Sequence, residues 1–88
     1  MILVNLRGEI IMRISARNQL KGTVVAIQEG AVNAIVQIKL SGGDIVSATI
    51  SLAAVKELGL VVGKEASAII KATSVMVGVE DWIRVVYK

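Results

Sequence analysis

The chain contains no cysteine, histidine, phenylalanine or proline. Without cysteine it can form neither a disulfide framework nor a thiolate metal site. The absence of histidine removes the commonest transition-metal ligand and the commonest general base. Most familiar catalytic arrangements are therefore excluded, and the sequence indicates a protein that is not an enzyme and uses no catalytic cofactor.

The net charge is small, and long uncharged apolar runs are absent. Ten lysines and arginines against seven aspartates and glutamates give a net charge of +3, a bias that fits anions of any size. No uncharged apolar run approaches the ~18 residues of a membrane span, and Arg7 and Glu9 interrupt the start too early for a secretory signal. These features predict a cytoplasmic protein that has no membrane partner.

Apolar residues, in contrast, are abundant. They make up 55% of the 88 residues, and most are Val, Ile, Ala and Leu. A single domain this short buries only ~60% of its unfolded surface when it folds alone. The excess of apolar residues therefore predicts faces that are buried between subunits of an oligomer.

Alternation of apolar and polar residues predicts a sheet. "TVVAIQEGAVNAIVQIKL" is typical of two strands around Gly30, and "SGGD" predicts a hairpin turn before the extended "IVSATI". "SLAAVKELG" predicts one short helix, which Ser51 caps and Gly59 ends. "ASAIIKA" and "TSVMVGV" predict two further strands, the second with Val75, Val77 and Val79 on one side. These elements predict an all-β fold, an OB-like barrel of about five strands with one short helix.

We divide the chain into an N-terminal extension over residues 1–11, a domain over residues 12–80 and a C-terminal extension over residues 81–88. The C-terminal extension alternates in a way that could add a strand, and pairing between the two extensions is one hypothesis. A second hypothesis makes Met12 the natural first residue, because codons for residues 7–9 can encode a ribosome-binding sequence. N-terminal sequencing of the naturally expressed protein tests it.

Three segments resemble a known family. "ISARNQLKGTVVAI", "GAVNAIVQI" and "IIKATSVMVG" are similar to the Mop family of small molybdate-binding domains, the molbindins, over about residues 12–80. The length resembles the stand-alone members, since it leaves no space for a DNA-binding or ATPase module. The resemblance implies an OB-like barrel that assembles as a homohexamer, a trimer of dimers, with molybdate or tungstate held at subunit interfaces.

The resemblance also implies which residues contact the oxyanion. Matched position by position, the family's contacts fall on five residues: Ser15, Arg17, Ser51, Lys71 and Ala72. Ala72 has no side-chain donor, so its contribution would come from the backbone N–H, and the hydroxyls of Thr73 or Ser74 could compensate. Hydroxyls, N–H groups and cations are the donors that a tetrahedral dianion requires.

Alternative interpretations remain for these residues. Asn18 and Gln19 are expected to hold a corner through local hydrogen bonds and to lie behind the anion contacts, and Lys21 is expected at the surface. Ser15 and Ser51 could be a turn hydroxyl and a helix cap, and Lys71 could be a strand-end lysine.

The leading hypothesis is a cytoplasmic protein that stores or buffers molybdate. One alternative is a single-stranded nucleic-acid binder, because OB-like barrels often bind single strands with stacked aromatic residues. The two aromatic residues, Trp82 and Tyr87, lie in the C-terminal extension, which argues against nucleic acid as a partner. The other alternative is a structural oligomer with no ligand.

Overall fold

The computed structural model describes residues 2–4, 10–12 and 14–81. Most of the regular structure is one antiparallel sheet of four strands in the order β5-β4-β3-β6. Its strands are β3 (Asn18–Glu29), β4 (Asn33–Leu40), β5 (Ile45–Ser51) and β6 (Glu65–Ile70). A helix, α1 (Leu52–Glu57), connects β5 to β6, and a 3-10 turn, η1 (Ala72–Ser74), follows β6. The predicted all-β class is confirmed.

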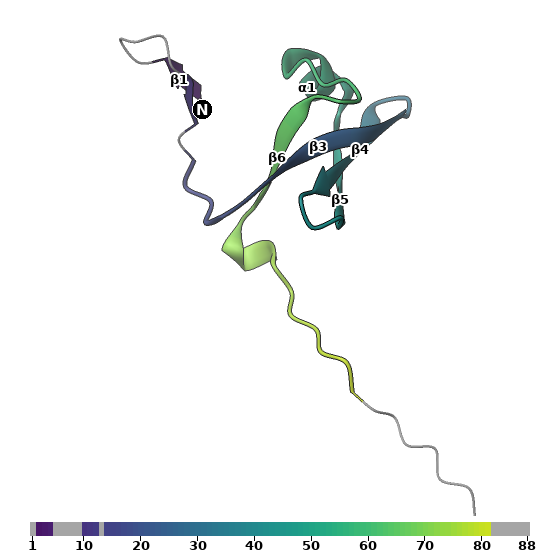
Figure 1. Ribbon diagram of the computed structural model, residues 1–88. Coiled ribbons are helices and arrows are strands. Elements are labelled where there is room, and N and C mark those ends of the chain that lie inside the picture. The colour runs from purple at the N-terminus through teal and green to yellow at the C-terminus, as the bar shows by residue number, and fades with distance from the viewer. Residues whose placement is uncertain (1, 5–9, 13, 82–88) are drawn as a thin grey trace, which may run out of the picture.

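Strand β3 curls the sheet into a half-barrel (Figure 1). Its first half, from Asn18 to Thr23, pairs with β6, and its second half, from Gly22 to Glu29, pairs with β4. The register shifts between Val24 and Ala26, and an extra residue of this kind increases the twist and bend of a strand. One continuous strand thereby serves both halves of the curled sheet.

The concave side of the half-barrel holds a small core. Its buried side chains come from three strands and from α1: Val24, Ala34, Val36, Ile38, Val55 and Ala68. Alternate residues of each strand face this side, which is why the period of two was readable in the sequence. At Gly22 a Cβ atom would lie 2.4 Å from the backbone oxygen of Lys39, so only glycine permits this approach of β3 to β4.

The short helix and the turns follow the sequence prediction. The Ser51 hydroxyl accepts a hydrogen bond from the Ala54 N–H at 3.0 Å, and Gly59 ends the helical segment with a φ of 62°. In the turn between β4 and β5, Gly43 has a φ of 96°. These are left-handed conformations that glycine adopts without a steric penalty.

The predicted strand over "TSVMVGV" is wrong. Residues 72–74 form η1 instead, and residues 75–81 have no regular structure. Within the described residues this segment runs away from the sheet (Figure 1), so it has no neighbouring strand with which to form a ladder.

Two short strands lie in the N-terminal extension and at its boundary with the domain. β1 (Ile2–Val4) pairs antiparallel with β2 (Ile10–Met12), with Leu3 opposite Ile11. The predicted strand in the C-terminal extension, and its pairing with the N-terminal one, fall on residues 82–88 and lie outside the described residues.

Candidate functional site

The polar stretch "ISARNQLKG" divides into a corner and the beginning of a strand. Residues 14–17 have no regular structure, and β3 begins at Asn18, five residues before the predicted strand. The Asn18 Nδ2 donates a hydrogen bond to the Ile70 carbonyl at 3.2 Å. The Gln19 Nε2 donates to the Ala16 carbonyl at 3.3 Å. Asn18 therefore ties the start of β3 to the end of β6, and Gln19 holds the corner before it.

The turn after β6 forms the other side of this region. The Ser74 N–H donates to the Lys71 carbonyl at 2.8 Å, and the Val75 N–H donates to the Ala72 carbonyl at 3.3 Å. Because Ile70 pairs with Asn18, the residues that follow Ile70 lie beside the residues that precede Asn18. The antiparallel pairing of β3 and β6 thus brings together two segments more than 50 residues apart in the sequence.

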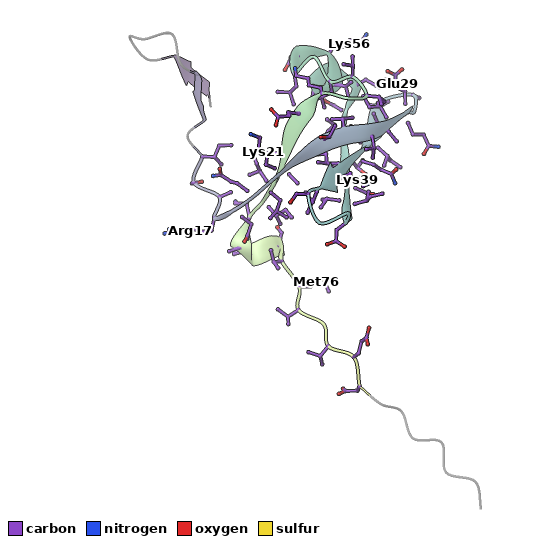
Figure 2. The ribbon with its side chains drawn as sticks, in the orientation of Figure 1. Arg17, Lys21, Glu29, Lys39, Lys56 and Met76 are labelled. Carbon is purple, nitrogen blue, oxygen red and sulfur yellow. The ribbon has the colours of Figure 1, made fainter. Side chains whose placement is uncertain are left out.

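These two segments line a small open cleft of about 140 Å³. Its lining consists of three residues from the corner and three from the turn: Ser15, Ala16, Arg17, Lys71, Ala72 and Thr73. Two side chains carry a positive charge, two carry a hydroxyl group, and no carboxylate belongs to the lining. The structure therefore brings four of the five predicted anion contacts together, and with them Thr73. Figure 2 shows Arg17 at this end of the sheet.

Within the described part of the chain, the cleft has positive charge that no acidic side chain balances. In the described part of the chain, an ion pair joins Lys21 to Glu65 at 3.3 Å. Neither residue lines the cleft, and both side chains are 72% exposed. For the described residues, no backbone or side-chain acceptor faces the N–H groups of Ala72 and Thr73. Cations and N–H donors without acceptors favour an anion.

Ser51 lies at the opposite end of the sheet. It ends β5, and it is the cross-strand neighbour of Asn33, next to the hairpin that joins β3 and β4. The helix that it caps carries Lys56, and Figure 2 shows Lys56 and Arg17 at opposite ends of the four-stranded sheet. The one predicted contact that the chain does not bring to the cleft is therefore Ser51. Ser74 lies in η1 beside the cleft and is exposed.

Ala16 is a lining residue that the sequence prediction did not name. Its side chain offers no donor, so residue chemistry gave no reason to select it. Its place between Ser15 and Arg17 was the available signal, since a cleft formed by a continuous segment includes each residue of that segment.

Other kinds of site have little support in the described residues. Among them, no three His, Cys, Asp or Glu side chains group in a way that could hold a metal ion. The helical segments described here include none with the length and apolar character needed to cross a membrane.

Comparison with known proteins identifies the family. A model described as the TOBE domain matches residues 14–77, a span of 64 of the 88 residues that contains both sides of the cleft. The chain belongs to the TOBE domain family. A probable molybdenum-pterin-binding protein from Haemophilus influenzae is 74% identical to this TOBE domain over 69 residues, which are 78% of this chain and 100% of the relative.

Solved structures agree with this assignment. MopII from Clostridium pasteurianum superposes on the TOBE domain with a TM-score of 0.73 and 46% identity, over 76% of this chain and 100% of MopII. A cytoplasmic molybdate-binding protein, ModG, solved with molybdate bound, gives a TM-score of 0.75 and 45% identity, over 91% of this chain and 55% of ModG. The resemblance to the Mop family that the sequence indicated is confirmed.

Proposed function

We propose that this protein binds molybdate, and that the cleft between the corner and η1 is part of the binding site. The observation that supports this function most directly is the lining of the cleft, where Arg17 and Lys71 lie beside two hydroxyl groups and no carboxylate. The names of relatives support the same ligand, because ModG was solved with molybdate bound and the relative from H. influenzae is named for molybdenum.

The donors at the cleft suit a tetrahedral dianion. The Arg17 guanidinium and the Lys71 ammonium group neutralise its charge, and the Ser15 hydroxyl donates a hydrogen bond. The N–H group of Ala72 takes the place of a side-chain donor, and Thr73 supplies the hydroxyl that Ala72 lacks. Such donors stabilise the anion without changing it. No nucleophile and base are paired at the cleft, and the proposed function is binding rather than catalysis.

Ser51 contacts the anion only if a second copy of the chain supplies it, because it lies at the far end of the sheet from the cleft. A site shared between copies requires an oligomer. We therefore propose the homohexamer, a trimer of dimers, with oxyanions at its subunit interfaces. Asn18, Gln19 and Ser74 then act from behind the contacts by fixing the two segments that carry them.

The proposed role is storage or buffering of molybdate in the cytoplasm, with tungstate as an alternative ligand of the same shape. Nucleic acid is not a proposed partner. Residues 14–81, which hold the whole sheet and the cleft, contain no aromatic residue on which bases could stack. A membrane is not a proposed partner either.

Isothermal titration of molybdate into five proteins, the wild type and four variants, tests the site. The variants Arg17→Ala and Lys71→Ala should each bind at least about tenfold more weakly, which corresponds to ~1.4 kcal/mol for the loss of one charged contact. Lys21→Ala is the matched control, because Lys21 belongs to the same stretch but pairs with Glu65 outside the cleft. Wild-type affinity in an Arg17→Ala/Lys71→Ala double variant would refute the assignment of the site.

A further inference from the structure

The hairpin formed by β1 and β2 stands apart from the four-stranded sheet (Figure 1). In the described part of the chain, β1 pairs with β2 and neither strand joins the larger sheet. The outer edge of each of these two strands is therefore free there. A free strand edge presents unpaired N–H and C=O groups, which another strand can bind.

The composition of the hairpin does not suit an isolated pair of strands. Successive residues of a strand face opposite sides, so a strand made of apolar residues has two apolar faces. All the residues of β1 and β2 are apolar: Ile2, Leu3, Val4, Ile10, Ile11 and Met12. Two strands alone are marginally stable in water, and independent stability requires at least three strands. The hairpin therefore needs a further strand.

The end of the chain has the composition of such a strand. Most of residues 82–88 are aromatic or β-branched, the types that are enriched in strands: Trp82, Ile83, Val85, Val86 and Tyr87. Seven extended residues span about 23 Å, whereas the three residues of β1 or of β2 span about 10 Å. Residues 82–88 are therefore long enough to run along the whole edge of either strand.

The hairpin and residues 82–88 are both additions to the shared domain. The TOBE match spans residues 14–77, and both segments lie outside it. MopII, whose structure is solved, is covered in full by 76% of this chain. The shared fold thus forms without such extensions, and neither of them is needed to complete the four-stranded sheet. This leaves each extension free to be the partner of the other.

The course of the chain decides which copy supplies the strand. In Figure 1 the chain enters the sheet from the hairpin through β3, and it leaves β6 through η1 in a direction away from β1. We propose that residues 82–88 of one copy form a third strand on the β1–β2 hairpin of a second copy. The interaction surface is a free edge of the hairpin, and its occupant is the C-terminal end of another chain. This inference goes beyond the proposed function, because it requires no anion.

Fluorescence of the single tryptophan tests the contact in the full chain. Trp82 is the one tryptophan of the sequence, and indole emission moves to longer wavelength when the ring enters water. Leu3→Asp and Ile11→Asp each place a carboxylate in an apolar hairpin, which opposes burial against another strand. We expect both variants to emit at longer wavelength than the wild type, close to the wavelength of the wild type in urea.

Val32→Asp is the matched control for these two variants. Val32 lies in the turn between β3 and β4, outside the hairpin, and is 72% exposed. Its emission should equal that of the wild type, and circular dichroism verifies that all variants are folded. Identical emission from the wild type, the two hairpin variants and the control would overturn the proposal.

Cross-linking identifies the copy that supplies the strand. The chain has no cysteine, so engineered cysteines react without background. Val85→Cys chains are mixed with Ile11→Cys chains, refolded together and treated with a short bis-maleimide, and a parallel mixture uses Leu3→Cys for the edge of β1. We expect a linked dimer from at least one mixture, at a yield several-fold above that with Val32→Cys. Yields equal to the Val32→Cys yield would contradict the docking.

A double variant separates exchange between copies from folding back within one chain. Ile11→Cys and Val85→Cys in the same chain should yield linked dimers and larger species. An internally linked monomer without linked dimers would show that residues 82–88 return to their own hairpin, and this would overturn the exchange.

Molybdate titration of the hairpin variants separates this inference from the proposed function. Leu3 and Ile11 do not line the cleft, so Leu3→Asp and Ile11→Asp should retain wild-type affinity for molybdate. A protein that links through Val85→Cys but binds no molybdate would refute the proposed function alone. A protein that binds molybdate but neither links nor changes its Trp82 emission would refute the docking alone.

Discussion

Ser51 caps α1 in the structure, and we propose that it also contacts the bound anion. Substitutions can separate these two roles. Its hydroxyl accepts a hydrogen bond from the Ala54 N–H at 3.0 Å, and the first turn of α1 contains no acidic residue. Replacing a serine cap by alanine costs about 1 kcal/mol. For a domain of this size such a loss lowers the melting temperature by about 4–8 °C. Ser51→Ala should therefore melt lower by that amount.

Ser51→Asp separates capping from anion binding. Aspartate caps a helix as well as serine does, and its charge is favourable at the start of a helix. A carboxylate beside a bound dianion is repulsive, however. We expect Ser51→Asp to keep the wild-type melting temperature or to exceed it, and to bind molybdate at least about tenfold more weakly.

Differential scanning calorimetry at one fixed protein concentration measures the first effect, because the stability of an oligomer depends on concentration. Titration calorimetry measures the second. Ser51→Asp with wild-type affinity for molybdate would refute the proposed contact of Ser51 with the anion, and Ser51→Ala with an unchanged melting temperature would refute the capping argument. The two results are independent.

Further predictions concern the sheet and the surface ion pair. Gly22→Ala should destabilise the protein by about 1–3 kcal/mol, because the added Cβ would lie 2.4 Å from the Lys39 carbonyl oxygen; urea denaturation measures the loss. Gly42→Ala is its control and should change stability by less than about 0.5 kcal/mol, since the nearest atom to a Cβ there is 4.0 Å away. Lys21→Ala should cost less than about 1 kcal/mol, because Lys21 and Glu65 are both mostly exposed, and a larger loss in the same assay would contradict this interpretation.

Local patterns in the sequence predicted the strands and the helix well. The alternation around Val36 and Ile38 marked β4, because one face of that strand is buried and the other is not. Ser51 and Gly59 marked the ends of the helical segment, because capping and a positive φ depend on single residues. Signals of this kind are contained in short stretches of the chain and need no knowledge of its neighbours.

The sequence failed where the structure depends on distant segments. Asn18 and Gln19 were predicted to hold a corner through local hydrogen bonds, yet β3 begins at Asn18, and the Asn18 side chain donates its hydrogen bond to Ile70 across the sheet. "TSVMVGV" alternates like a strand, but residues 75–79 run away from the sheet and lie beside neither of its edges. Alternation reports that one face of a segment can be buried, and it does not report whether another segment lies beside it to form a ladder.

The candidate site also has a part that short motifs predicted and a part that depends on the arrangement of the strands. The resemblance named Ser15, Arg17, Lys71 and Ala72 from two short motifs, and the pairing of β3 with β6 brings those motifs together. No rule within one sequence could have separated Ser51 from the other four. The separation follows from strand direction: β5 and β6 run in opposite directions, so they end at opposite ends of the sheet.

Titration of molybdate into the assembled wild-type protein, with sulfate as the competing tetrahedral dianion, tests the central claim most directly. The account predicts a Kd for molybdate below about 1 μM, equivalent to about −8 kcal/mol or stronger, and much weaker binding of sulfate. An assembled, folded protein that shows no binding of molybdate and retains no molybdenum on purification would contradict it.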